Sequence, residues 1–408
     1  MLTINTQLDV TYTYPIHNPW KMEDIIIFDI ETTGLSPATS YLYLIGCMYY
    51  TDNSWHLTQW LAEDINNEIC IIEAFMEKIK TYKRIIHYNG SGFDIPYILK
   101  KCKKHNLASS LDTIQSFDLY KKLQPYKKLL PTKDLKLKTV EKLVNLERVD
   151  TLSGEELIKV YSGFVGRLQY EKLRKIRQQN QIEINANDTF THSTLESITS
   201  PSSSDLMNLL LLHNKEDIVG LLKIADLLFF IDGFQLNVSF HNYSRKLITE
   251  HNTEYYKIHI YQPFVFPCSL ILRTPLNLPN LNILLEFTEN QIVLTLPLYK
   301  GELKLFYDNY KDYFYLPKED IAIHKSVSQF VDKEFKTPAK ANNCYQKVTS
   351  NFIPQPGTFY TPCFKENYND KLLFFEINNK DFQAEQRFQE FIMNWLEFIL
   401  HDKSTVLD

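Results

Sequence analysis

The segment from Ile25 to Gly34 is the feature that most constrains the fold of this chain. Its β-branched and aromatic residues predict a buried strand, and Asp29 and Glu31 are the two charged positions within it. Side chains two positions apart in a strand point to the same face, so these two carboxylates lie side by side. Burying them requires a cation, and a hard divalent ion such as Mg2+ or Mn2+ is suitable. Taken alone, a D-x-E pair is explained more simply by two solvated acids on an edge strand.

Composition limits the classes of protein that fit. The chain has 408 residues, of which 44% are hydrophobic and 13% aromatic, enough for two domains with cores of their own. No window is apolar enough for a membrane span and the N-terminus lacks a signal-peptide pattern, so we expect no membrane association and a cytoplasmic location. The six cysteines include no C-x-x-C pair, which argues against a zinc site or a disulfide framework. With a net charge of -5, any nucleic-acid binding must use local basic patches.

The first half of the chain alternates strands and helices. Residues 1–22 read as an irregular lead-in before the strand at 25–30. Strands are then predicted at 41–50 and 54–61, a helix at 68–81, and strands at 84–87 and 114–118. We expect an α/β domain over residues 23–232 and a second domain over residues 235–408.

A glycine-bearing loop follows the strand at 84–87 and brings in a third acid. Asn89 and two glycines precede Phe93 and Asp94, which stands at the start of the next predicted helix. Loops at the carboxyl ends of strands are where ligand-binding groups collect in α/β sheets. The ordinary alternative for Asp94 is a helix N-cap.

The region from 121 to 204 has a basic part and a polar part. Eight lysines between 121 and 142, Lys136 and Lys138 among them, form the best local candidate for phosphate contacts, although such a surface is often only solvated. Ser153 with Glu156 predicts a capped helix that runs to about residue 178. Residues 185–204 are rich in Ser and Thr and predict a loop.

A long apolar helix is predicted from 205 to about 230. His213 and Asp217 are four residues apart and therefore share a face. A histidine on an apolar helix is more often a core residue than a catalyst, so its pairing with Asp217 is what suggests a function.

Together these segments resemble the three motifs of the DEDD exonucleases, and most closely the YprB-type ribonuclease-H-like domain. The resemblance covers roughly residues 23–232. It rests on Asp29-x-Glu31-x-x-Gly34, Asn89-Gly90-x-x-Phe93-Asp94-x-Pro96 and His213-Asn214-x-x-Asp217, with further counterparts in Leu135 to Glu141 and Arg148 to Gly154.

The resemblance implies a fold, a site and a reaction. The fold is a mixed sheet of five strands flanked by helices. The metal ligands are Asp29, Glu31, Asp94 and Asp217, which would hold two Mg2+ or Mn2+ ions for hydrolysis of a phosphodiester bond. Substrate contacts are expected from Thr33, Gly34, Asn89, Phe93, Lys136 and Lys138.

His213 departs from the family pattern. Families with a catalytic histidine have it five residues before the last aspartate, where this chain has Leu212. His213 instead occupies the position of the tyrosine subclass. Imidazole has an unperturbed pKa near 6.5 and could still act as the base, so His213 is included among the catalytic candidates.

From about residue 235 the pattern predicts a β-rich α+β domain. Hairpins are expected at 282–296 and 302–316, and a closing amphipathic helix at 382–400. Lysines interleaved with aromatic residues between 322 and 348 suit single-stranded nucleic acid. The simpler alternative for that stretch is an ordinary amphipathic helix and loop.

The predicted function is metal-dependent hydrolysis of DNA or RNA, as a 3'-5' exonuclease. A structure-selective endonuclease could use the same fold and metals. The alternative from another class is a non-catalytic nucleic-acid-binding or scaffold protein, against which the presence of all four acids argues. Nothing in the sequence specifies an oligomeric state.

Overall fold

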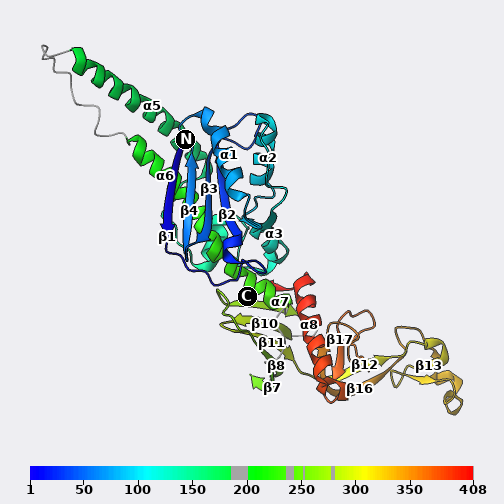
Figure 1. Ribbon diagram of the computed structural model, residues 1–408. Coiled ribbons are helices and arrows are strands. Elements are labelled where there is room, and N and C mark those ends of the chain that lie inside the picture. Colours follow the sequence, from blue (N-terminus) through cyan, green and yellow to red (C-terminus); the bar gives the residue numbers. More distant parts are fainter. Residues whose placement is uncertain (185–200, 236–242, 251–252, 277–280, 408) are drawn as a thin grey trace. The chain divides into compact units, whose positions relative to one another are not determined.

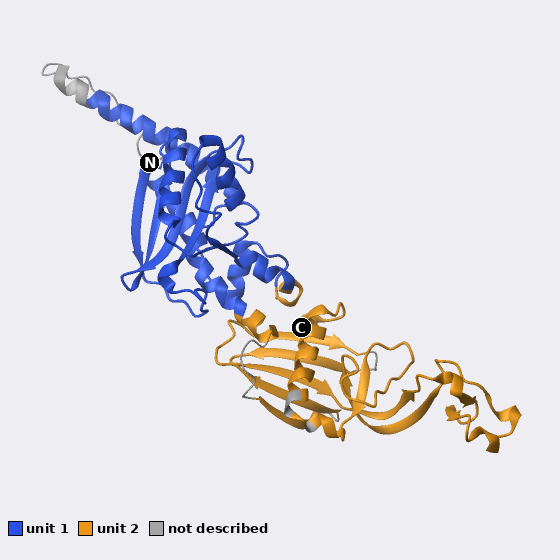
Figure 2. Cartoon of the chain, turned by 45° about the vertical axis from the view of Figure 1, so that its right-hand side comes forward, with its two compact units in different colours: residues 1–125, 132–228 blue, residues 126–131, 229–408 orange. Residues whose placement is uncertain are grey.

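The chain forms two compact units in this computed structural model, which describes residues 1–184, 201–235, 243–250, 253–276 and 281–407 (Figure 2). Unit 1 comprises residues 1–125 and 132–228, and unit 2 comprises residues 126–131 and 229–408. In the described residues no helix is both long and apolar enough to span a lipid bilayer.

Unit 1 contains a mixed six-stranded sheet in the order β1-β4-β3-β2-β5-β6 (Figure 1). Its strands are β1 (Leu2–Leu8), β2 (Ile25–Thr32), β3 (Leu42–Thr51), β4 (Ser54–Leu61), β5 (Arg84–His87) and β6 (Gln115–Asp118). β1, β4, β3 and β2 pair antiparallel, whereas β2, β5 and β6 pair parallel. The expected mixed sheet is therefore present, with six strands in place of five.

The sixth strand corrects the prediction of an irregular lead-in. β1 pairs with β4 over its whole length, from Leu2 opposite Leu61 to Leu8 opposite Trp55. Its side chains alternate between more and less exposed positions, which is the pattern of an edge strand with one solvated face. Because the outward positions are polar, the apolar signal of this strand was too weak to be recognised.

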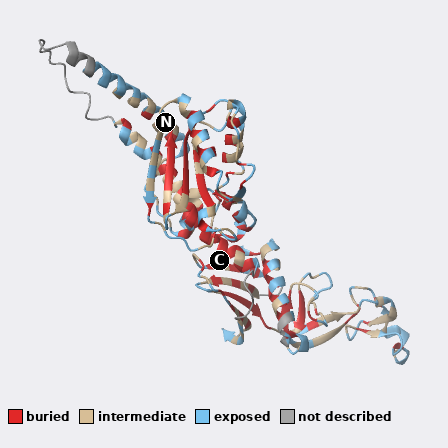
Figure 3. Cartoon of the chain, in the orientation of Figure 1, coloured by how far each residue is buried: buried red, intermediate tan, exposed pale blue. Residues whose placement is uncertain are grey.

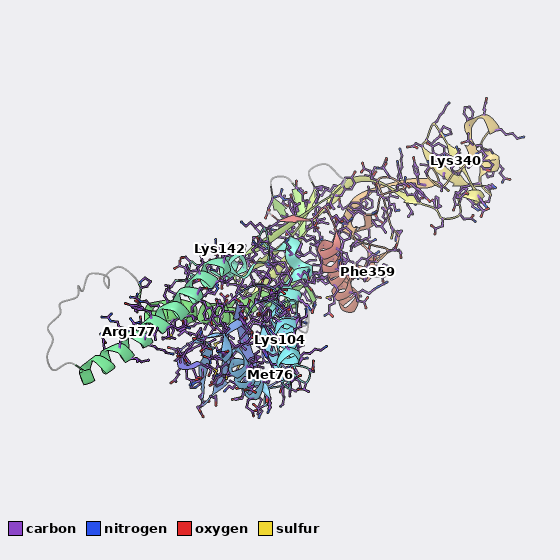
Figure 4. The ribbon with its side chains drawn as sticks, turned by 90° about the horizontal axis from the view of Figure 1, so that it is seen from above. Met76, Lys104, Lys142, Arg177, Lys340 and Phe359 are labelled. Atoms are coloured by element: carbon purple, nitrogen blue, oxygen red, sulfur yellow. The ribbon has the colours of Figure 1, made fainter. Side chains whose placement is uncertain are left out.

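The helices of unit 1 follow the predicted order. They are α1 (Glu68–Ile79), α2 (Asp94–His105), α3 (Leu119–Leu123), α4 (Leu137–Val140), α5 (Gly154–Ile184) and α6 (Ser203–Ile224). The capping pair at the start of α5 is confirmed, since Glu156 accepts hydrogen bonds from the backbone and hydroxyl of Ser153. Most of the loop predicted at 185–204 lies outside the described residues, and α6 begins at Ser203. α5 packs against α6, and its distal part carries Arg177 (Figure 4).

Two helices cover opposite faces of the central strand β2. Phe28 stacks on Phe75 of α1, with ring centroids 5.2 Å apart. Asp29, the next residue, points to the other face and contacts Asn214 of α6. The interior strands are buried almost throughout, as the red ribbon in Figure 3 indicates. β2 therefore carries a conventional apolar core on one face and acids on the other.

The helix predicted from 205 to about 230 is two helices. α6 ends at Ile224, a short 3-10 turn covers residues 225–227, and α7 (Leu228–Gln235) follows. The division between the two compact units falls at residues 228 and 229. The chain thus changes unit within what the sequence pattern presents as one apolar helix.

Unit 2 is β-rich, as expected, and its described residues form three sheets. The largest has the order β18-β9-β10-β11-β8-β7, and the smaller ones are β12-β16-β17 and β14-β13-β15. The elements are β7 (Tyr243–Glu250), β8 (Thr253–Tyr261), β9 (Leu270–Pro275), β10 (Asn282–Thr288), β11 (Gln291–Pro297), β12 (Tyr299–Phe306), β13 (Tyr313–Leu316), β14 (Ile321–His324), β15 (Thr337–Pro338), β16 (Tyr345–Gln355), β17 (Leu373–Glu376), α8 (Glu385–His401) and β18 (Val406–Leu407).

The predictions for unit 2 are confirmed in part. β10 and β11 form the predicted hairpin, and α8 is the predicted closing helix, packed through Phe388 on Tyr243 of β7. The hairpin predicted at 302–316 is wrong, because β12 pairs with β16 and β13 pairs with β14 and β15. A local turn signal does not reveal that a strand pairs with one about forty residues further on.

The lysine and aromatic stretch at 322–348 contains no α-helix. It forms β14, short 3-10 turns, β15 and the start of β16, with Lys340 just after β15 (Figure 4). Lys336 lies 5.4 Å from the ring of Phe314, but its amino group also binds two backbone carbonyls. Phe330 is 82% exposed. The single-strand binding predicted for this stretch stays a prediction.

Candidate functional site

Asp29 and Glu31 lie near the carboxyl end of β2, on the face that α6 covers. Asn214 donates its side-chain amide to the Asp29 carboxylate over 3.1 Å and to its backbone carbonyl over 3.3 Å. Gly46 on the neighbouring strand makes this approach possible, because a Cβ there would lie 2.0 Å from Asn214 Oδ1. Asn214 Oδ1 also accepts a hydrogen bond from Gln59. The amide is thereby fixed in one orientation, with its donor toward Asp29.

Asp94 enters the site from the loop after β5. The loop turns at Asn89, whose φ is 58°, and Asp118 accepts hydrogen bonds from the backbone N–H of Asn89 and Ser91. Gly90 packs against His87, where a Cβ would lie 2.7 Å from the imidazole ring. The alternative explanation of Asp94 as an N-cap does not hold, because Phe93 occupies the cap and Asp94 is the first residue of α2.

His213 and Asp217 lie one turn apart on α6 and face the acids of β2. His213 Nε2 lies 3.7 Å from Glu31 Oε1 and 3.5 Å from Asp217 Oδ2. On the other side of the ring, Nδ1 lies 2.7 Å from Asp150 Oδ2. His213 is buried, with 6% of its surface exposed. It is therefore a buried residue, but one whose two nitrogens both face carboxylates rather than apolar core.

The electrostatics indicate that the four predicted acids share one environment. Burial raises the pKa of Asp29 well above its ordinary value, and the charges of Glu31, Asp217 and Asp94 raise it further. Burial and the charges of Asp217 and Asp94 likewise raise the pKa of Glu31. Burial raises the pKa of Asp94 to about 7, with smaller contributions from Asp118 and Asp217. Like charges gathered in a buried place cost free energy unless cations offset them.

Arg148 is a functional candidate that the motif search did not include among the site residues. It is buried and forms an ion pair with Asp217, and its other nitrogens lie 3.1 Å from Glu141 and 3.4 Å from Glu216. The sequence did contain a signal for Arg148, because the segment Arg148-x-Asp150 belongs to the resemblance to the YprB-type domain. In the described part of the chain, no Lys or Arg forms an ion pair with Asp29, Glu31 or Asp94.

The residues predicted to contact substrate have varied surroundings. Thr33 and Gly34 belong to the turn after β2, where Thr33 pairs with Tyr41 and Gly34 accepts hydrogen bonds from two hydroxyl groups. Asn89 and Phe93 belong to the loop that carries Asp94. These four positions therefore adjoin the acids in sequence.

The two predicted lysines differ from one another. Lys136 is exposed, and its backbone N–H binds Asp134. Lys138 binds Asp150 over 3.2 Å through its amino group, which also reaches the carbonyl of Leu152. Lys138 thus supports the partner of His213, whereas Lys136 has its charge at the surface.

One group of side chains has the spacing of a metal site. Among the described residues, ligand atoms of Glu31, His213 and Asp217 lie within 4.8 Å of one another. Carboxylate oxygens suit Mg2+ and Mn2+, and an imidazole nitrogen suits transition metals. The donor set therefore fits a divalent ion, with a histidine that the four-acid prediction did not count among the ligands.

Comparison with known proteins supports the fold. Residues 26–195 match the family RNase_H_2, described as RNase_H superfamily. A similar solved structure is that of the family B DNA polymerase from the hyperthermophilic archaeon Pyrobaculum calidifontis, with 12% identity and a TM-score of 0.33. That similarity covers 72% of this chain and 36% of the polymerase, so the chain spans about a third of its length. No curated protein matches this chain in sequence.

The match at residues 26–195 and the mixed sheet indicate a ribonuclease-H-like fold for unit 1. The fold class expected from the sequence is thereby confirmed, with the strand number corrected to six. The matched range includes Asp29, Glu31 and Asp94 and ends before His213 and Asp217. The finer YprB-type assignment stays a prediction.

Proposed function

We propose that this protein is a divalent-metal-dependent nuclease, and that it acts as a 3'-5' exonuclease on DNA or RNA. The observation that carries the proposal is the excess of negative charge gathered at the end of β2. Asp29, Glu31 and Asp94 come from two segments, and burial and neighbouring carboxylates raise the pKa of each, yet none is paired with Lys or Arg among the described residues. Such an arrangement favours binding of cations that the chain itself does not supply. A ribonuclease-H-like domain is in keeping with nuclease activity.

Each acid has a role in this proposal. Asp29, Glu31, Asp94 and Asp217 would hold two Mg2+ or Mn2+ ions through their oxygens. When bound, divalent ions lower the pKa of a water molecule and offset the charge that develops on the phosphate oxygens. Asn214 keeps the Asp29 carboxylate in one orientation, so little reorganisation is needed at the moment of reaction.

Residues around the acids would position the nucleic acid. The turn with Thr33 and Gly34 and the loop with Asn89 and Phe93 flank the acids, and glycine permits a close approach of the backbone. Lys136 has an exposed side chain that could pair with a phosphate. We therefore expect the substrate strand to pass over the carboxyl end of β2.

The test is hydrolysis of 5'-labelled single- and double-stranded DNA and RNA with Mg2+ or Mn2+. Asp29→Asn is compared with Asp24→Asn, which removes an acid just before β2 that pairs with Lys83 at the surface. Stepwise shortening from the 3' end, abolished by EDTA and by Asp29→Asn but not by Asp24→Asn, is the expected result.

Other outcomes distinguish the alternatives. Internal fragments without a ladder would indicate an endonuclease. No cleavage of any substrate, together with no rise in melting temperature on adding Mn2+, would contradict the proposal and favour a nucleic-acid-binding protein.

A further inference from the structure

His213 lies between two sets of charged residues. The first, called the acidic cluster, consists of Asp29, Glu31, Asp94 and Asp217, and the second consists of Lys138, Arg148 and Asp150. Its Nδ1 meets Asp150, and its Nε2 lies between the carboxylates of Glu31 and Asp217. Its side chain is 7% exposed, so bulk water has little access to the ring. The two ring nitrogens therefore have different surroundings: Nδ1 meets one carboxylate, and Nε2 faces two others.

Asp150 is held firmly as the partner of Nδ1. Its Oδ2 lies 3.2 Å from Lys138 Nζ and 3.6 Å from Arg148 Nη2, and its Oδ1 accepts the backbone N–H of Leu152. A fixed, anionic acceptor selects the tautomer with hydrogen on Nδ1, which leaves the lone pair on Nε2.

We infer that His213 Nε2 is a direct ligand of one of the divalent ions, together with Glu31 and Asp217, and that Asp150 orients it. This inference rests on the proposed metal-dependent function and sharpens it. A site with one imidazole nitrogen among its ligands binds Mn2+, Co2+ or Zn2+ better, relative to Mg2+, than a site of oxygens alone. The chain would thus differ from the four-acid pattern in the metal it prefers.

The positions of the three side chains fit a shared metal ion. Nε2 faces two carboxylates, and the three ligand atoms lie within 4.8 Å of one another. Ligand atoms about 2 Å from one ion lie up to about 4 Å apart, so only small movements would close the group around it. A carboxylate on the far ring nitrogen is the usual support of a metal-bound histidine.

Pulsed electron paramagnetic resonance of the full chain with Mn2+ alone tests this inference. We expect modulation from a directly bound 14N nucleus, replaced by a 15N pattern when the protein is grown with 15N-histidine. His213→Gln should abolish the modulation and weaken Mn2+ binding about 10- to 100-fold, while Mg2+ binding weakens less. Labelling the wild type needs no substitution, so the test does not depend on the variant folding.

Two further variants assign the effect to this histidine. His105→Gln is the matched control, because His105 also meets a carboxylate, Glu68, but at a different place in unit 1. It should keep the modulation and the Mn2+ affinity. Asp150→Asn should keep the nitrogen coupling and lower Mn2+ affinity about 10-fold, since Asp150 acts through the ring rather than on the ion.

The outcomes separate this inference from the proposed function. Mn2+ that binds the wild type, is lost in Asp29→Asn and shows no histidine coupling would overturn the ligand role and leave the nuclease proposal intact. His213 would then contact the acids without contacting the ion. Absence of any Mn2+ binding to the folded wild type would contradict both.

Discussion

Unit 1 buries two groups of charged residues, and they differ in how completely they are paired. The first group consists of Glu68 and Lys101, which are 3% and 0% exposed and lie 2.7 Å apart. The second group is the acidic cluster at the end of β2. The side chains of Glu31 and Asp217 keep 13% and 15% exposure, so both groups are largely, but not equally, withdrawn from water and each carries a desolvation cost.

In the first group every charge has a partner. Lys101 donates to the carbonyl of Ser40 and lies 5.3 Å and 5.6 Å from the rings of Tyr41 and Tyr97. The Glu68 carboxylate accepts the backbone N–H of Leu42 and meets His105 at 3.1 Å. This group ties α1 and α2 to the turn that follows β2, and it needs nothing from outside the chain.

In the second group the acids outnumber their partners. Arg148 pairs with Asp217, but the pKa values of Asp29, Glu31 and Asp94 are raised by burial and by neighbouring carboxylates. The comparison teaches that burial alone does not mark a functional site. What distinguishes the second group is charge that the chain leaves uncompensated, and removing a charge should therefore have opposite effects on stability in the two groups.

The largest expected effect is on catalysis. Under the proposed function, Asp217→Asn removes one of the metal-binding carboxylates, so nucleic-acid cleavage should fall by at least about 10²-fold, given that even outer partners of metal ligands cost 10- to 100-fold. Initial rates with Mn2+, compared with those of Lys101→Met at a temperature where both are folded, measure this. Equal losses in the two variants would contradict a special role for the acidic cluster.

The next effect is on the stability of the paired group. Lys101→Met leaves Glu68 buried without its main cation, and breaking a buried pair in this way costs about 3–5 kcal/mol. Urea unfolding followed by circular dichroism measures the free energy of unfolding. A loss below about 1 kcal/mol would mean that His105 and the backbone amide of Leu42 compensate Glu68 without the lysine.

The free energy of unfolding of the metal-free protein should decrease as pH rises, whereas a paired aspartate has the opposite effect. Burial raises the folded-state pKa of Asp94 to about 7, whereas an unfolded aspartate titrates near about 3.9. The folded state therefore binds more protons between these values, and the stability that Asp94 contributes is present at low pH and lost as pH rises through 7.

Melting temperatures in EDTA between pH 5 and 8 test this. The wild type should lose stability relative to Asp94→Asn as pH rises, by a few kcal/mol at most, since one pKa unit is about 1.4 kcal/mol. At pH 8 the metal-free Asp94→Asn variant should be the more stable protein. Parallel curves for the two proteins would mean that Asp94 is ionised at no cost.

The smallest effect concerns the second partner of Glu68. His105→Gln keeps a hydrogen-bond donor near the carboxylate, and Lys101 remains in place, so the loss should be about 1 kcal/mol or less. The same urea experiment measures it. A loss of unfolding free energy as large as that of Lys101→Met would show that His105 is the main group that compensates the charge of Glu68.

The residues that were predictable are those whose signal is local. Asp29 and Glu31 interrupt an apolar strand, Asp94 follows a glycine loop, and His213 and Asp217 share a helix face, so each could be found within a window of about ten residues. From β2 onward, the order of the strands in unit 1 followed from the same kind of signal, whereas β1 was missed.

The site residues that were not predicted contact side chains that are far away in the sequence. Asp150 meets His213 from 63 positions away, and Arg148 meets Asp217 from 69 positions away. The pairing of β12 with β16 is likewise set by packing rather than by any turn between them. Periodicity does not specify which distant side chains meet, because only the folded arrangement brings them together.

The acidic cluster joins β2 to α6, and Asn214 reaches Asp29 across 185 positions of the chain. Contacts of such long separation close late in folding, after the entropy of the intervening chain has been lost. A divalent ion held there would therefore stabilise the native state without stabilising the transition state, and would slow unfolding while leaving the folding rate unchanged. A metal ion bound at this site would then lower the unfolding rate of unit 1, in addition to the role in hydrolysis proposed for it.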